Sequence, residues 1–236
     1  RLPLSGGSST FNPILLEDQI TSTLPPCLDA ILNDVKSLPN GKFGSVMRQF
    51  VGLNPVTQNY NWTLTSAYFP PSAQGLQPDA ARTSGSNPAI TTINDFYLQK
   101  STDLSFARTM IHEAFHAYLS CVYRFRNFDM SYVNLINQYA TQFNNNRNDI
   151  DHHIFAQNNI INHISQALME YGALKGYTLS QQFCDDMAWA GLIGTSAFNG
   201  LPQSQQDRIR SRLEAETFNN NNNLLNLSPV GQQPCP

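Results

Sequence analysis

Charged residues are unusually scarce in this sequence. Asp, Glu, Lys and Arg together make up 13% of the 236 residues, against a usual share of about 25%. Lysine occurs only at positions 36, 42, 100 and 175, and the formal net charge is −3. The chain therefore lacks the basic excess that nucleic-acid-binding proteins carry, and we expect no nucleic-acid partner.

Long apolar runs are also missing. The apolar stretches are short and interrupted, whereas a membrane-spanning helix needs about 20 consecutive apolar residues. Hydrophobic residues nevertheless make up 41% of the chain, which is too many for a disordered protein of low net charge. We therefore expect a soluble globular protein with a packed core and without a membrane span.

Uncharged polar residues, above all asparagine, replace the missing charge, and positions 219–223 are all Asn. The chain opens at Arg1 with a Ser/Gly-rich stretch and shows no signal peptide, which is typical of a processed sequence. Four cysteines fit either disulfides in an oxidising compartment or four buried free thiols. Composition thus favours a secreted, periplasmic or cell-surface protein, and the cysteine pairing stays open.

The pattern along the chain divides it into a flexible lead-in (1–12), a single domain (13–217) and an Asn/Pro-rich tail (218–236). Strands are expected at 59–69 and 89–98, separated by a Pro/Gly/Ser-rich loop at 70–88. Apolar residues at helical spacing predict helices at 27–36, 43–51, 103–123, 131–142, 149–175, 180–192 and 203–217. This order predicts an α+β fold, in which a small N-terminal sheet precedes a long helix and a mainly helical second half.

The helix expected at 103–123 contains His112-Glu113-Ala114-Phe115-His116. Residues four apart on a helix lie on one face, so both imidazoles can reach a single Zn²⁺. Glu113 can then accept a proton from a water on that metal. Apolar residues flank the motif on both sides and predict burial, where two histidines and a glutamate are costly without a metal or polar partners. We expect a zinc site here.

On these residues the sequence resembles the zincin metallopeptidases, most securely over the block 89–124. The resemblance implies that His112 and His116 are zinc ligands and that Glu113 is the general base. It also implies that the strand at 89–98 lies along the cleft and pairs with an extended substrate. The stretch 111–119 further looks like uncharacterised bacterial secreted proteins of SprT-like character. Leu119 and Val122 stand where metzincins carry Gly and a third His, which excludes that branch.

The third zinc ligand has several candidates in the helix expected at 149–175. We choose His152, because Asp149-x-x-His152 resembles a pattern that follows the motif helix in the SprT-like proteins, and Asp149 can orient the imidazole. His153 is the alternative favoured by helical projection, and Glu170 is the one that gluzincins would use. His163 is expected to be a surface or partly buried histidine rather than a ligand.

Four further features have weaker functional interpretations. Asp185 and Asp186 are expected to be a charged helix start, and the arginines at 208, 210 and 212 a solvated helix face. Tyr171 and Tyr177 could stabilise an oxyanion, although core packing is the commoner role of such residues. A disulfide between Cys121 and Cys184, one of three possible pairings of the four cysteines, would join the motif helix to a later helix.

The leading hypothesis is a zinc-dependent peptidase that acts on a peptide or protein substrate. In it, Zn²⁺ is held by His112, His116 and His152, and Glu113 deprotonates the attacking water. The alternative is a non-catalytic, zinc-containing binding module of a larger secreted or surface protein.

Overall fold

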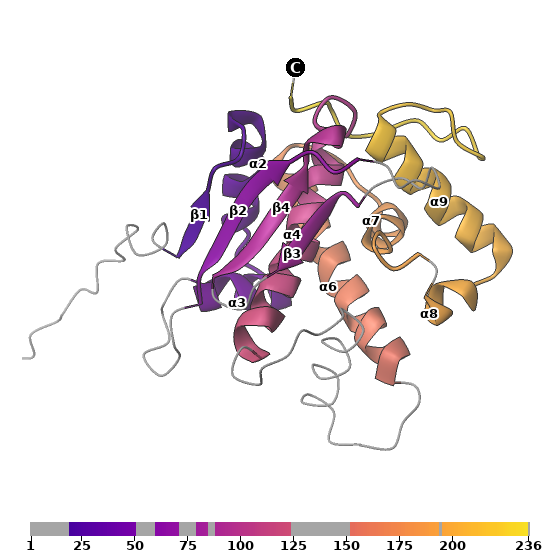
Figure 1. The fold of residues 1–236 in the computed structure, drawn as a ribbon. Helices are drawn as coiled ribbons and strands as arrows, with labels where there is room; N and C mark the ends of the chain where they lie inside the picture. Colours follow the sequence, from indigo (N-terminus) through magenta and orange to yellow (C-terminus); the bar gives the residue numbers. More distant parts are fainter. Residues whose placement is uncertain are drawn as a thin grey trace, which may run out of the picture.

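The computed structural model describes residues 19–50, 60–70, 79–84, 88–123, 152–193 and 195–235. Over these ranges the chain forms an α+β arrangement of one four-stranded mixed sheet and seven α-helices (Figure 1). The lead-in expected at 1–12 and the helix expected at 131–142 lie outside the described residues. No helix in the described ranges combines the length and the apolar character that a membrane span requires.

The sheet has the strand order β1-β2-β4-β3. Three strands are parallel, and the fourth, β3, lies antiparallel to β4 at one end of the sheet. The strands are β1 (Ile20–Ser22), β2 (Trp62–Ala67), β3 (Ala81–Ser84) and β4 (Ala89–Asn94). The short η1 turn (Asp95–Tyr97) follows β4, so the strand expected at 89–98 ends earlier than its apolar pattern indicated.

β3 overturns two of the sequence-based expectations. It lies inside the segment 70–88, which was expected to be a loop. It also covers one side of β4, while β2 covers the other, so β4 offers no free edge to an extended substrate. The expectation that strand 89–98 pairs with substrate is therefore wrong, and β3 is the strand at that edge in the described part of the chain. Only Thr83 in β3 is β-branched, and pairing with β4 decides its conformation.

One face of the sheet is covered by helices. Trp62, Leu64 and Ile93 point toward the helices and are fully buried, whereas their chain neighbours Thr63 and Thr92 are partly exposed on the other face. This alternation is the period of two expected for a half-buried sheet. The helices are α2 (Pro26–Lys36), α3 (Gly41–Phe50), α4 (Asp103–Tyr123), α6 (His152–Leu174), α7 (Gln181–Ala188), α8 (Ser196–Asn199) and α9 (Gln203–Phe218).

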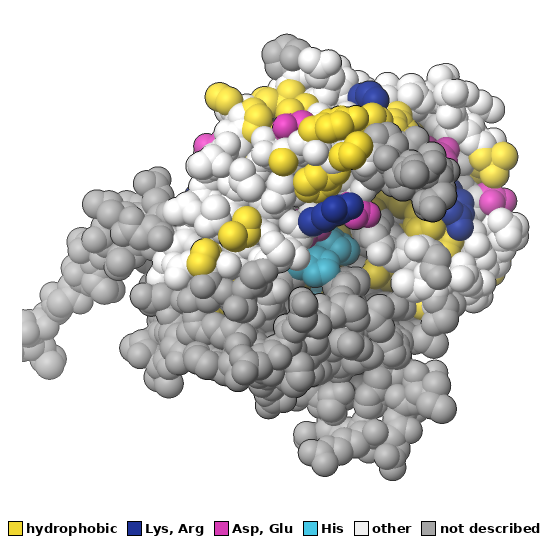
Figure 2. Space-filling model, viewed as in Figure 1, with side chains coloured by type: hydrophobic (Ala, Val, Ile, Leu, Met, Phe, Trp, Pro, Cys, Tyr) yellow, Lys and Arg dark blue, Asp and Glu magenta, His cyan; other side chains and the backbone are white. Residues whose placement is uncertain are grey.

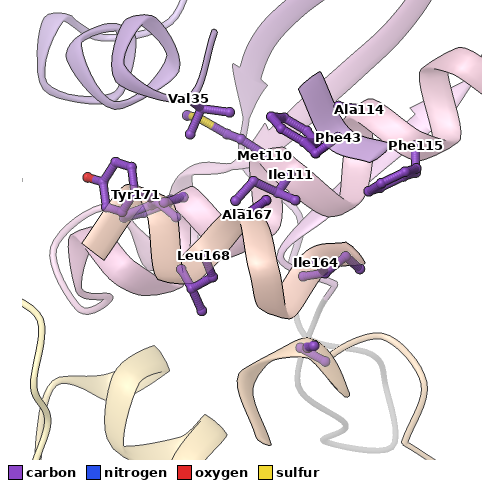
Figure 3. Close-up of a cluster of buried hydrophobic side chains, with 14 of the residues drawn as sticks. Val35, Phe43, Met110, Ile111, Ala114, Phe115, Ile164, Ala167, Leu168 and Tyr171 are labelled. Carbon is purple, nitrogen blue, oxygen red and sulfur yellow. The ribbon is translucent and has the colours of Figure 1, made fainter. Parts of the chain in front are cut away.

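α4 is the central helix of this layer. Its Met110 and Ala114 pack toward Val35 of α2 and Phe43 of α3, and Ile111 lies beside Ala167 of α6 (Figure 3). Residues 101–115 are all buried, which confirms the burial predicted for this part of the motif helix. α4 begins where the hydroxyl-rich sequence predicted, because Thr102 Oγ1 accepts a hydrogen bond from the Ser105 amide at 3.2 Å.

The C-terminal segment is docked onto the start of α4. Asp103 Oδ1 accepts a hydrogen bond from the Gln232 amide at 2.9 Å. Glu216 of α9, fully buried, accepts one from the Gly231 amide at 3.2 Å. A disulfide then joins Cys27 of α2 to Cys235.

The disulfide settles the cysteine pairing. Cys121 and Cys184 are free and buried, so the bond considered between them does not form. The chain thus contains both kinds of cysteine that composition allowed, one disulfide and two buried thiols.

Candidate metal centre

The side chains of His112, Glu113 and His116 form a compact group on α4, here called the His–Glu–His cluster. Their ligand atoms all lie within 4.8 Å of one another. The Nε2 atoms of the two imidazoles face each other at 3.0 Å. Two nitrogen ligands of a tetrahedral Zn²⁺ lie about 3.3 Å apart when each metal–nitrogen bond is about 2.05 Å long. The spacing therefore fits joint coordination of one ion.

Both imidazoles are prepared to act as ligands. Burial lowers the pKa of His112 well below its ordinary value, and the neighbouring charges of His116 and Arg108 lower it further. Burial lowers the pKa of His116 to about 4. Both rings are therefore neutral near pH 7, which is the state that binds a metal ion.

Glu113 is buried beside the edge strand of the sheet. It is 6% exposed, and its Oε2 accepts a hydrogen bond from Thr83 Oγ1 of β3 at 2.6 Å. Burial raises the pKa of Glu113 to about 7, although the bond from Thr83 and the charge of Arg108 act in the opposite direction. A carboxyl group with a pKa near 7 can take up and release a proton at neutral pH.

Arg108 lies one helical turn before His112 and is 6% exposed. Its Nε has no hydrogen-bond partner in the described part of the chain. Its positive charge acts on both His112 and Glu113. Burial lowers the pKa of Arg108 to about 10, and the charge of Glu113 acts in the opposite direction, so Arg108 places a positive charge beside the cluster.

The turn after α7 supplies a close backbone contact to the cluster. α7 ends at Ala188, earlier than the expected helix end at 192, and the chain turns through Gly191 at a φ of 82°. A Cβ at Gly191 would lie 3.0 Å from Cε1 of His112. Glycine is therefore required there both by the backbone conformation and by the space beside the imidazole.

The third ligand is not among the described side chains near the cluster. No further His, Cys, Asp or Glu of the described residues belongs to the group that could hold an ion. This leaves out Glu170, and it leaves out His163, whose ring stacks on Phe115 with centroids 6.3 Å apart. α6 begins at His152, but the side chains of His152 and His153 lie outside the described residues. The assignment of His152 stays a prediction.

The two candidate tyrosines belong to the other end of α4. Tyr177 donates a hydrogen bond to Asp103 Oδ2 at 3.0 Å. Tyr171 is fully buried, and its pKa is raised by burial and by the charge of Asp103. Asp103 precedes His112 by nine residues, or about 13 Å along a helix. An oxyanion role for either tyrosine therefore finds no support in the geometry: Tyr177 binds the start of α4, and the Tyr171 hydroxyl is buried without a hydrogen-bond partner in the described part of the chain.

Two of the three arginines expected on a solvated face of α9 form ion pairs, and Arg210 is exposed as expected. Arg208 binds Asp186 through two hydrogen bonds of 2.9 and 3.0 Å, and Asp186 is buried. Arg212 pairs with Glu216 at 3.3 Å. The expected solvated arginine face is therefore wrong for these two residues. Asp185, also expected at a charged helix start, instead accepts hydrogen bonds from neighbouring Ser165 and Gln181.

Sequence reasoning found the three residues of the cluster and missed Thr83, Arg108 and Gly191. A glycine just past a helix is a known stop signal, so Gly191 could have been noticed. No local signal marked Thr83, because its strand was not recognised. Figure 2 shows histidine side chains at the surface of the face that it presents, and His116 is the partly exposed member of the cluster.

Comparison with protein-family models, with curated proteins and with solved structures finds no match for this chain. The function is therefore inferred from the chemistry and geometry of the cluster.

Proposed function

We propose that the protein is an exported zinc-dependent peptidase of the zincin type. The observation that carries the proposal is the buried pair of neutral imidazoles whose Nε2 atoms lie 3.0 Å apart, with a carboxylate of raised pKa as the next residue. This set contains two nitrogen ligands and a proton acceptor, which are the groups that zinc-assisted hydrolysis needs.

His112, His116 and, on our prediction, His152 would hold the ion. When bound, Zn²⁺ would supply Lewis acidity that polarises a carbonyl and lowers the pKa of a water. Glu113 accepts the proton of the attacking water and delivers it to the leaving amine. Its pKa of about 7 suits both transfers, because a group that first takes and then gives a proton needs a pKa near the working pH.

Export is supported by the Cys27–Cys235 disulfide. Disulfides persist in oxidising compartments and are rare in the reducing cytosol. The low share of charged residues is consistent with this location, although composition alone is a weaker argument.

The proposal is tested by metal analysis followed by cleavage of a peptide library with and without a chelator. The wild-type protein should contain one zinc and lose cleavage when it is chelated. Glu113→Gln should keep the zinc and lose activity by about 100-fold or more, because a general base contributes about 10²–10⁴ in rate. Glu214→Gln, at an exposed position of α9, is the matched control and should cleave as wild type does.

Two outcomes would contradict the peptidase. A wild-type protein without zinc would remove the metal site. Full zinc content with no cleavage of any peptide would instead favour the non-catalytic binding module.

A further inference from the structure

A chain of three hydrogen bonds runs across the sheet and ends on Glu113. Trp62 Nε1 of β2 donates to Thr91 Oγ1 of β4 at 2.8 Å. The hydroxyls of Thr91 and Thr83 lie 2.6 Å apart. Thr83 Oγ1 of β3 then donates to Glu113 Oε2 at 2.6 Å. The residues come from three neighbouring strands and from α4.

The direction of this chain is fixed by chemistry. An indole N–H can only donate, so Thr91 accepts from Trp62. In its ionised state, in which Glu113 acts as a base, the carboxylate can only accept, so Thr83 gives its hydrogen to Glu113. The one hydrogen left between the two threonines must be that of Thr91, which points to Thr83. Every donor in the chain is therefore oriented toward the carboxylate.

The strand register creates the arrangement. Thr83 lies directly opposite Thr91 in the antiparallel pair, where side chains of one face are in contact. A shift of one residue would turn Thr83 to the other face of the sheet. Trp62 and Thr91 are fully buried, so water does not compete for the bond between them.

We propose that Trp62, Thr91 and Thr83 form a relay that positions the carboxylate of Glu113 for catalysis. This inference rests on the proposed function, and Thr83 acts as a positioning residue through Glu113. The bond from Thr83 holds Oε2, and no described residue forms a hydrogen bond to Oε1. Oε1 is thus the oxygen that takes the proton of the attacking water.

The need of the buried indole N–H for a hydrogen-bond acceptor does not by itself explain the whole chain of bonds. Thr91 alone would provide the acceptor that Trp62 needs. The second threonine extends the chain to Glu113, and each bond in such a chain polarises the next. The four residues should consequently behave as one coupled unit.

The coupling can be tested in the resting protein by nuclear magnetic resonance, without substrate. The chain has two tryptophans, Trp62 and Trp189, so two indole N–H signals are expected, and Trp189→Phe assigns them. Glu113→Gln should shift the Trp62 signal. In a Thr83→Val background the same change should no longer shift it, whereas in a Thr83→Ser background it should.

The catalytic consequence is tested with the same variants in the zinc-loaded protein. Thr83→Val should lower kcat by about 10- to 100-fold, which corresponds to the loss of one hydrogen bond to a charged group. KM and zinc content should stay close to wild type, and Thr83→Ser should restore most of kcat. Thr92→Val, which follows Thr91 and faces the other side of the sheet, is the control and should keep wild-type kcat.

The outcomes separate this inference from the proposed function. A Trp62 signal that ignores Glu113→Gln would refute the relay even in an active zinc peptidase. A normal kcat in Thr83→Val would refute the positioning role. An inactive wild-type protein would contradict the peptidase, while the indole signals would still decide whether the relay couples Trp62 to Glu113.

Discussion

The main chain of Gly191 lies directly against the imidazole of His112. A Cβ at this position would meet Cε1 at 3.0 Å and Nε2 at 3.3 Å, and φ is 82°. Gly191→Ala should therefore displace the ring of His112. We expect zinc affinity to fall by about 10-fold or more, as it does when groups that orient a metal ligand are changed. Competition with a chromophoric chelator measures this loss.

Gly176→Ala provides a matched control for the backbone. Gly176 has a φ of 80°, and a Cβ there would meet nothing within 4 Å. Both substitutions carry the strain of a left-handed residue, about 1 kcal/mol, but only Gly191→Ala crowds His112. Equal zinc affinities in the two variants would show that the contact does not matter for the metal.

Removal of the third ligand should empty the site. We expect His152→Ala to lower zinc affinity by more than about 100-fold, because loss of a ligand exceeds the 10- to 100-fold cost of losing a group that only orients one. His153→Ala and Glu170→Gln, measured in parallel by metal analysis after dialysis, should retain zinc. Retention in His152→Ala together with loss in either of the others would reassign the ligand.

Arg108 should set the acid limit of activity through its charge. Its positive charge lowers the pKa of Glu113, so Arg108→Met should raise that pKa. The base is active only when ionised, and a higher pKa moves the fall of kcat/KM on acidification to higher pH. The pH profile of kcat/KM measures this shift. The prediction would be contradicted if the fall of kcat/KM on acidification stayed at the wild-type pH or moved to lower pH.

The same substitution should leave the fold intact. Nε of Arg108 has no hydrogen-bond partner in the described ranges, and methionine has a similar length without the cost of a buried charge. Thermal unfolding of Arg108→Met should therefore occur at or above the wild-type temperature.

The disulfide should contribute substantially to stability. Cys27 and Cys235 are 208 residues apart, and removal of a bond that closes so long a loop costs about 2–5 kcal/mol. Urea unfolding of the double variant Cys27→Ser/Cys235→Ser measures the loss. Reductant should bring the wild-type protein to the stability of this variant and leave the variant unchanged.

A thiol titration checks the pairing independently. The unfolded, unreduced wild-type protein should react at two thiols, Cys121 and Cys184. Four reactive thiols would exclude the assigned disulfide, and none would show that Cys121 and Cys184 are disulfide-bonded as well.

The sequence predicted α4 and the cluster well, because both follow from local patterns. Helical periodicity, the Thr102 cap and the spacing of His112 and His116 all depend on residues within a few positions of each other. The parts that were missed depend on distant partners. Thr83 lies in a strand because that strand pairs with β4, where Thr91 is opposite it. Arg208 forms an ion pair because the fold brings Asp186 beside it. No single-sequence pattern contains these pairings.

The cysteines illustrate the same limit. Four cysteines allow three pairings, and nothing local distinguishes the partner of Cys27 from the others. The choice depends on α2 and the C-terminal segment meeting beside the start of α4, which is a property of the tertiary fold.

Because the C-terminal segment is docked onto the start of α4, α4 can complete its contacts only after that segment has been made. The amide that binds Asp103 at the start of α4 belongs to Gln232, which lies 129 residues later in the sequence. Cys235, the disulfide partner of Cys27, lies 208 residues after it. During synthesis or threading through a pore, the helix that carries the cluster lacks its N-terminal anchor until nearly the last described residue has emerged. Contacts of such long range also slow folding. The helix that carries the His–Glu–His cluster is therefore completed late, after the rest of the described chain is available.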